Sequence, residues 1–201
     1  MDFEQHKLKL RPLYQLAAVI GDLRLCVFSR RCLIFNNMSG DPVTKTPREI
    51  VREARASDVP EIVSLINRAF AVERFFKNAD RTNPEQVQQM MAEGKFLLLA
   101  EQGHIVACVF IRLTGDRAYL GTLAVDPARQ KSGLGGRMMR EAETYCRVAG
   151  CKALDIRIVN VRTELPDIYR KYGFVETGTQ SAEMIKTATQ PIHFITMSKP
   201  L

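Results

Sequence analysis

The stretch LAVDPARQKSGLGGR, residues 123–137, joins the end of an apolar segment to three glycines and the start of a helical pattern. A strand pattern ends at Val125, and helical spacing of apolar residues begins at Leu134. Backbone amides in the first turn of a helix have no partner within the helix and lie at its positive end, so they bind anions. Glycine there lets a ligand approach the backbone closely. The stretch predicts a strand, a phosphate-binding loop and a helix.

Two well-known phosphate loops do not fit this spacing. A Walker loop needs Lys followed by Ser or Thr after its last glycine, whereas Lys131 and Ser132 precede Gly133. A dinucleotide-binding fingerprint needs a further glycine where Met138 stands, and it needs a mostly parallel sheet. A glycine-containing turn that binds no ligand remains the alternative interpretation.

Patterns on both sides of the loop predict an α/β fold of the α+β type. Apolar alternation and turn residues indicate strands over 50–55, 96–100, 104–111, 118–125 and 153–159, one from residue 174, and one over 192–197. Helices are expected after Asp58 and Asn83, from Leu134 to Gly150, and over 164–172; Asp58 and Glu61 have capping-box spacing. Because a helix joins 118–125 to 153–159, these strands should be parallel in a mixed, mostly antiparallel sheet flanked by helices.

Composition limits the classes of protein. With 201 residues, 46% of them hydrophobic and 25% charged, one globular domain is expected. The net charge of +7 attracts polyanions, but the basic residues are dispersed, so neither nucleic acid nor a membrane is expected as a partner. Five scattered cysteines without a C-x-x-C pair and three unclustered histidines favour reduced thiols, no metal and a cytoplasmic location.

Residues 1–47 differ from the rest of the chain. A cluster of turn residues over 36–42 marks a boundary, so we expect an N-terminal extension over 1–47, outside the core, and the main domain over 48–201. The extension could be an appended helix or strand, an unpacked tail, or a transit peptide, although its acidic residues disfavour the last. A start at Met38 is a further hypothesis, which the intact mass of the native protein would decide.

Three motifs together resemble a known enzyme superfamily. The spacing Gln130-x-x-Gly133-x-Gly135 resembles the acyl-CoA loop of the GNAT superfamily of N-acyltransferases. Asn160 follows the fifth expected strand, and YRKYGF, residues 169–174, resembles the late Y-x-x-x-G-F segment of that family. The resemblance covers residues 48–201 in the family's order of strands and helices, and it implies the GNAT-like fold.

The resemblance implies transfer of an acetyl group from acetyl-CoA to a primary amine, by direct attack on the thioester. The acceptor would be a small molecule or a peptide, and a homodimer is compatible with the sequence. Backbone groups of the fourth strand would pair with the pantetheine arm, and the loop would hold the diphosphate. The implied cofactor-binding residues are Leu123, Ala124, Val125, Gln130, Lys131, Ser132, Gly133, Leu134, Gly135, Gly136 and Arg137.

Catalytic candidates follow from the same resemblance. Tyr169 would protonate the departing thiolate, or else only pack its helix against the sheet. Asn160 would order the cofactor amide or a water, or else serve as a turn residue. Glu73 is the candidate base, with Asp80 and Glu164 as alternatives, although water-mediated deprotonation is equally compatible. A non-catalytic acyl-CoA sensor is the competing function.

Overall fold

A seven-stranded sheet is the framework of the computed structural model, which describes residues 50–183 and 185–201. The expected extension over 1–47 lies outside the described residues. In the sheet order β1-β2-β3-β4-β5-β7-β6, the β4–β5 pair is parallel and the other neighbours are antiparallel, which confirms the mixed, mostly antiparallel sheet. The strands are β1 Ile50–Glu53, β2 Lys95–Glu101, β3 His104–Thr114, β4 Arg117–Val125, β5 Ala153–Val159, β6 Val175–Ser181 and β7 His193–Pro200.

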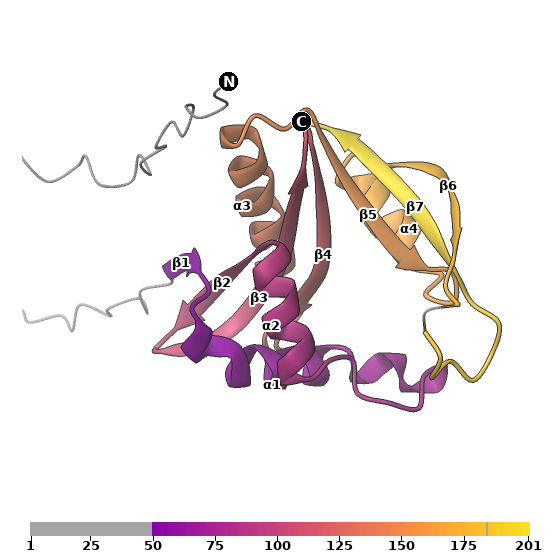
Figure 1. Cartoon of the computed structure of the whole chain (residues 1–201), viewed down its shortest axis with the longest axis horizontal. Coiled ribbons are helices and arrows are strands. Elements are labelled where there is room, and N and C mark those ends of the chain that lie inside the picture. Colours follow the sequence, from indigo (N-terminus) through magenta and orange to yellow (C-terminus); the bar gives the residue numbers. More distant parts are fainter. Residues whose placement is uncertain (1–49, 184) are drawn as a thin grey trace, which may run out of the picture. The chain divides into compact units, whose positions relative to one another are not determined.

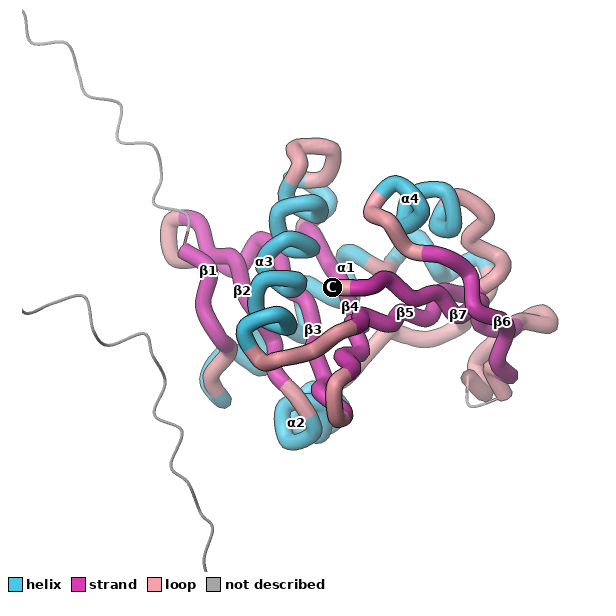
Figure 2. The backbone as a smooth tube through the Cα atoms, turned by 90° about the horizontal axis from the view of Figure 1, so that it is seen from above, coloured by secondary structure: helices cyan, strands magenta, loops and turns pink. Residues whose placement is uncertain are grey.

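Helices cover both faces of the sheet, because each presents an apolar side to it. The helices are α1 Val59–Ala69, α2 Pro84–Glu93, α3 Leu134–Val148 and α4 Leu165–Lys171. Residues of α1 and α2 form one core with one face of the sheet, and α3 forms a second core with the other face, where side chains of α4 also pack. Helix α3 lies along β3 and β4 and less closely along β2, and Figure 2 shows it over this part of the sheet. None of the helices in the described part is both long and apolar enough to cross a bilayer.

The parallel strands β4 and β5 are paired over a short length only. Their register begins at Arg117 opposite Ala153 and ends at Tyr119 opposite Asp155. Two hydrogen bonds between Arg117 and the Asp155 carboxylate hold this closed end together. Beyond it the strands diverge, and Figure 1 shows the opening between them. The backbone of β4 after Tyr119 therefore has no ladder partner on its β5 side.

A bulge in β4 changes which face of the sheet its side chains occupy beyond Gly121. Between Gly121 and Ala124, β4 contains one residue more than the opposite segment of β3. Thr122 takes up the extra length with a φ of 50°, which is unusual for a β-branched residue. As a result Leu120 and Leu123 pack against the same core, although strict alternation would put residues three apart on opposite faces.

The expected capping box at α1 is wrong, whereas the cap of α2 is confirmed. Asp58 makes no side-chain cap on α1; its carboxylate accepts two hydrogen bonds from Arg52, at 2.7 and 2.8 Å. Glu61 accepts a hydrogen bond from the Ile105 amide at 2.8 Å, which connects α1 to β3. Asn83 caps α2 in a complete capping box. A nearby arginine on β1 and a distant backbone amide on β3 thus take the two carboxylates that the expected capping box would use.

Candidate active site

The loop before α3 presents open backbone amides. Gly133 precedes the helix with a φ of 87° and no side-chain cap, and Lys131 has a φ of 62°. The amides of the first turn therefore point out of the helix without a capping oxygen. A Cβ on Gly133 would meet no atom within 4 Å, and a Cβ on Gly135 would meet only Val125, at 3.9 Å. The space beside these two glycines is open, as a bound anion requires.

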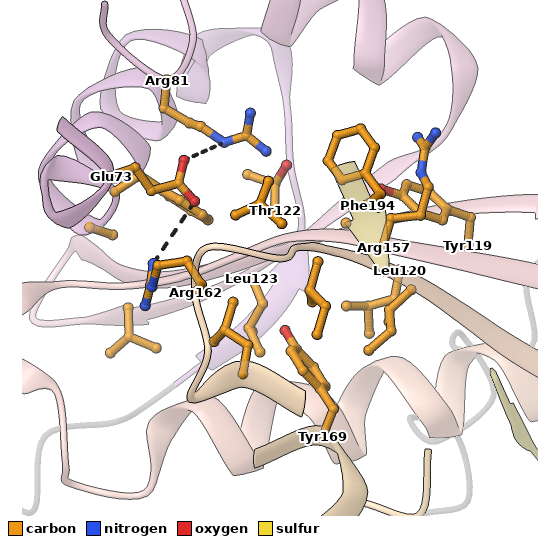
Figure 3. Close-up of a pocket in the computed structure, with 18 of the residues that line it drawn as sticks. Glu73, Arg81, Tyr119, Leu120, Thr122, Leu123, Arg157, Arg162, Tyr169 and Phe194 are labelled. Atoms are coloured by element: carbon orange, nitrogen blue, oxygen red, sulfur yellow. Dashed lines mark ion pairs between the residues drawn. The ribbon is translucent and has the colours of Figure 1, made fainter. Parts of the chain in front are cut away.

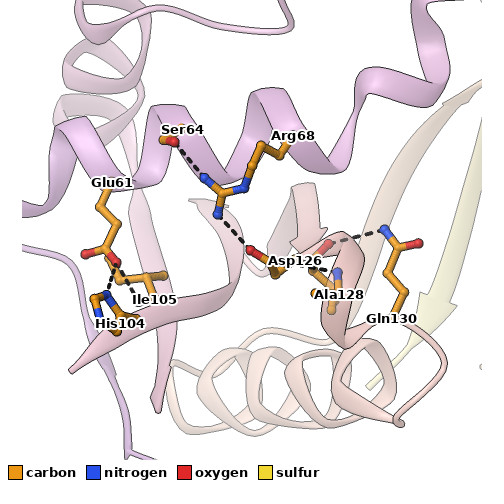
Figure 4. A network of polar contacts seen from close by, with 9 residues as sticks. Glu61, Ser64, Arg68, His104, Ile105, Asp126, Ala128 and Gln130 are labelled. Carbon is orange, nitrogen blue, oxygen red and sulfur yellow. Dashed lines mark hydrogen bonds and ion pairs between the residues drawn. The ribbon is translucent and has the colours of Figure 1, made fainter. Parts of the chain in front are cut away.

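A polar network fixes the start of this loop (Figure 4). Arg68 on α1 donates to the Asp126 carboxylate at 2.7 Å, and Asp126 accepts from the Ala128 amide at 3.0 Å. The hydrogen bond from Arg68 lowers the pKa of Asp126, so this carboxylate stays charged. Gln130 donates to the Val125 carbonyl at 3.3 Å. The end of β4 is thus tied to α1 on one side and to the loop on the other.

A cavity of about 200 Å³ occupies the opening between β4 and β5. Of the expected cofactor-binding residues, Leu123, Val125 and Gln130 line it. Leu134, the first residue of α3, is buried in the core between α3 and the sheet, and Ala124 is buried in the core with α1 and α2. Only the backbones of these two residues could therefore contact a ligand. Lys131 and Ser132 are exposed, and Arg137 is half-buried.

Gly136 has a packing role in the structure. A Cβ there would lie 2.9 Å from the Tyr172 hydroxyl, so the absence of a side chain allows the segment around α4 to approach α3. This contact favours glycine at this position independently of any ligand, since a larger side chain would displace Tyr172.

Tyr169 packs through its ring and reaches the cavity through its hydroxyl. Its ring meets Phe174 edge to face, with 5.7 Å between centroids. The residue lines the cavity, and Figure 3 shows the oxygen directed into it. Burial, and secondarily the proximity of Tyr119, raises the pKa of Tyr169 to about 12. The phenol is therefore protonated at neutral pH and is able to donate a hydrogen bond.

Glu73 lines the same cavity from the opposite side of the strands (Figure 3). It lies on a short 3₁₀ helix, Ala71–Phe75, and is only 8% exposed. Its oxygens lie 3.7 Å from Arg81 Nε and 3.9 Å from Arg162 Nη1. Burial raises the pKa of Glu73 despite these arginines. A buried carboxylate with a raised pKa is a better proton acceptor than an exposed one.

The other candidate residues lie outside the lining of the cavity. Asp80 pairs with Arg74 at 3.2 Å and is largely exposed, and Glu164 pairs with Arg162 at 2.6 Å. Asn160 accepts a hydrogen bond from the His193 amide at 2.9 Å, next to the β5–β7 ladder. The structure thus brings Glu73 and Tyr169 together at one cavity and leaves Asn160 at the end of the sheet.

Sequence reasoning missed further polar and aromatic residues that line the cavity, among them Tyr119, Arg157, Arg162 and Phe194. Arg157 had a usable signal, since it alternates with apolar residues in β5 and had to face away from the α3 core. The others come from separate elements, so nothing local to them indicates a shared site. In the described part, no three His, Cys, Asp or Glu residues are grouped so that they could hold a metal ion.

Comparison with known proteins agrees with this geometry. The family model described as acetyltransferase (GNAT) domain matches residues 64–199. The chain is 30% identical over 94 residues to streptothricin acetyltransferase of Streptomyces lavendulae. The match covers 47% of this chain and 50% of the relative. It is 35% identical over 83 residues to glucosamine 6-phosphate N-acetyltransferase 1 of Oryza sativa subsp. japonica. This match covers 41% of this chain and 48% of the relative. The chain thus spans about half the length of the curated relatives it matches.

A solved structure shows the same fold. The GNAT family acetyltransferase of Elizabethkingia anophelis, crystallised with acetyl-CoA bound, matches with a TM-score of 0.61 and 16% identity. The match covers 76% of this chain and 98% of that one. Because the family model spans most of the described residues and the fold agrees, this chain belongs to the GNAT acetyltransferase family.

Proposed function

We propose that the protein transfers an acetyl group from acetyl-CoA to a primary amine by direct attack of the amine on the thioester. The observation that carries this proposal is one cavity between diverging strands with Tyr169 on one side and Glu73 on the other. The cavity also reaches Gln130, at the start of the loop with open amides. A proton donor, a proton acceptor and an anion-binding loop are the groups that this transfer requires.

The loop suits the diphosphate of coenzyme A. The uncapped first turn of α3 offers N–H donors at the positive end of a helix, and exposed Lys131 adds charge. Leu123 and Val125 lie on the part of β4 that has no ladder partner toward β5, which supports strand-like pairing with an extended pantetheine arm. Bound acetyl-CoA would supply an acyl carbon activated by its thioester.

Each residue then has a defined task. Glu73 accepts a proton from the ammonium group of the acceptor, so that the neutral nitrogen can attack. As the C–N bond forms and the C–S bond breaks, Tyr169 donates its phenolic proton to the departing sulfur, and the proton that the nitrogen loses on becoming an amide returns to the phenolate through solvent. A backbone amide of β4 near the bulge would stabilise the developing oxyanion, an effect worth about 3 kcal/mol for one donor. The enzyme itself forms no covalent bond to the acyl group.

The catalytic unit is proposed to extend over residues 48–201.

Cys108, Cys146 and Cys151 are buried free thiols, which supports the proposal of a reducing compartment such as the cytoplasm.

Titration of acetyl-CoA into wild type and two Gly135 variants tests the proposal. Because a Cβ on Gly135 meets only Val125, at 3.9 Å, both Gly135→Ala and Gly135→Glu should fold. Gly135→Ala should bind acetyl-CoA nearly as well as wild type, whereas Gly135→Glu should lose binding through repulsion of the diphosphate. Unchanged affinity in folded Gly135→Glu would contradict the loop assignment.

Release of free thiol in the presence of a panel of primary amines tests the transfer step. Wild type should release coenzyme A only when an accepted amine is present. Tight acetyl-CoA binding without transfer to any amine would favour the acyl-CoA sensor instead.

A further inference from the structure

The acceptor side of the cavity carries an excess of positive charge. Three arginines line the cavity, Arg81, Arg157 and Arg162, whereas Glu73 is the one carboxylate among its lining residues in the described part. Arg162 is already neutralised, since it pairs with Glu164 at 2.6 Å and lies 3.9 Å from Glu73. Arg81 lies 3.7 Å from Glu73, a carboxylate that it shares with Arg162. Within the described residues, the charge of Arg81 is therefore compensated only in part and that of Arg157 not at all.

Arg157 is held in place by aromatic rings and has no acidic partner. Its guanidinium carbon lies 4.9 Å from the centroid of the Tyr119 ring and 5.4 Å from that of Phe194. Nη1 donates to the neutral side-chain oxygen of Gln180 at 3.2 Å. Within residues 50–183 and 185–201, no carboxylate lies within ion-pair distance of Arg157. Stacking orients the group while leaving most of its N–H donors available.

Arg81 has the same combination of stacking and an unused donor. Its guanidinium lies 5.2 Å from the centroid of the Phe70 ring. Its Nε atom is buried and has no hydrogen-bond partner, because the nearest Glu73 oxygen is 3.7 Å away. A buried donor without a partner is uncommon in a folded protein and indicates a missing group.

These arginines lie on the opposite side of the strands from Tyr169. Arg157 alternates in β5 with Ile156 and Ile158, which pack in the α3 core, so Arg157 faces the side of α1 and α2. Figure 3 shows Arg81 and Arg157 on the same side as Glu73, with Tyr169 beyond the strands. The unpaired charge of Arg157 is therefore on the same side of the strands as the proposed base, Glu73, and away from the thiolate side.

We infer that the amine acceptor carries an anionic group, a carboxylate or a phosphate, which Arg157 and Arg81 bind. This inference rests on the proposed function and names the class of its acceptor. Glu73 would receive the cationic end of such a molecule, while the two guanidiniums would receive the anionic end. Two oriented arginines suit the planar carboxylate or the phosphate through paired N–H donors, and a cavity of about 200 Å³ suits a small molecule.

Binding of matched amines to the CoA-saturated protein tests the inference without requiring turnover. Calorimetric titration compares β-alanine with β-alaninamide, and O-phosphoethanolamine with ethanolamine. Saturating CoA occupies the loop before α3, so an added anion must bind elsewhere. The anionic member of at least one pair should bind about 10-fold more tightly than its neutral partner. The pair with the larger ratio distinguishes carboxylate from phosphate, and equal binding within both pairs would overturn the inference.

Three variants assign the preference to these side chains. Arg157→Gln and Arg81→Gln should each reduce affinity for the anionic amine about 10-fold while leaving the neutral amine unchanged. Arg157→Lys should recover part of the loss. The matched control is Arg112→Gln, because Arg112 also lies over Tyr119, at 5.5 Å, but pairs with Glu93 and does not line the cavity. If Arg112→Gln lost as much affinity for the anionic amine, the effect would come from the net charge of the protein and not from a site, and the inference would be overturned.

Failure of this inference is distinguishable from failure of the proposed function. Acetyl transfer to neutral and anionic amines with equal KM would overturn the anion site and keep the transferase. A clear anion preference in binding, without transfer to any amine, would support the anion site and overturn the transferase.

Discussion

The hydroxyl oxygen of Tyr172 lies 2.9 Å from the position that a Cβ atom would take on Gly136. This close approach brings the first turn of α3, whose amides are proposed to bind the anion, next to the end of α4, the helix that carries Tyr169. A side chain at Gly136 would displace Tyr172 where these two parts of the proposed site meet.

Gly136→Ala should destabilise the protein, because Tyr172 must move to accommodate a methyl group. The expected cost is about 1 kcal/mol in the free energy of unfolding, relative to Gly135→Ala, which has open space. Urea unfolding measures both. Adding Tyr172→Phe to Gly136→Ala should recover the loss, since the next Tyr172 atom lies 3.7 Å away. Equal stability of the two single variants would refute this account of Gly136.

Tyr169→Phe should lower kcat about 100-fold and leave the Kd for acetyl-CoA nearly unchanged, because it removes a proton donor and keeps the ring. Tyr172→Phe is the matched control, since it removes a hydroxyl from the residue that ends α4 and does not line the cavity. With the pKa of Tyr169 raised to about 12, kcat should show no alkaline loss from this phenol below about pH 10. Wild-type kcat in Tyr169→Phe would remove the residue from the mechanism.

Glu73→Gln should change the pH dependence of stability in a definite direction. Because burial raises the pKa of Glu73, its protonated form favours the folded state, and that contribution is lost as pH rises through the raised pKa. The Tm of Glu73→Gln minus that of wild type should therefore increase between about pH 4 and pH 7. Thermal unfolding across this range measures it.

Glu164→Gln is the control for that experiment and should show the opposite trend. Although burial acts to raise the pKa of Glu164, hydrogen bonds to backbone and to Arg162 bring it below its ordinary value. Its contribution to stability is present above the pKa of the unfolded chain and is lost as pH falls. The Tm difference for Glu164→Gln should thus fall with rising pH, and parallel trends in the two variants would contradict the assignment.

Thr122→Gly should cost little stability or none, because glycine adopts the φ of 50° without the strain of a β-branched residue. Thr179→Gly is the comparison, since Thr179 pairs with Ile195 in the β6–β7 ladder. Thr122→Gly should be the more stable variant by about 1 kcal/mol in urea unfolding. The reverse order would show that the Thr122 side chain contributes more than its backbone strain costs.

The sequence by itself determined the order of strands and helices, the loop before α3 and the family resemblance. These features are written in short-range patterns: apolar alternation in β5, helical spacing in α3, and glycines at fixed distances after Gln130. Local backbone geometry and burial impose these periods directly, so they can be read without knowing what lies opposite.

Only the tertiary structure decided which polar groups meet at the cavity. Glu73 was one of three equivalent carboxylates until folding buried it at the cavity that Tyr169 lines from the other side, and left Asp80 and Glu164 outside the cavity lining. Arg157 packs against aromatic rings on β4 and β7, and Glu61 accepts a hydrogen bond from the Ile105 amide on β3 instead of completing the expected capping box. Such contacts depend on distance in space between segments remote along the chain, and no local pattern encodes that distance.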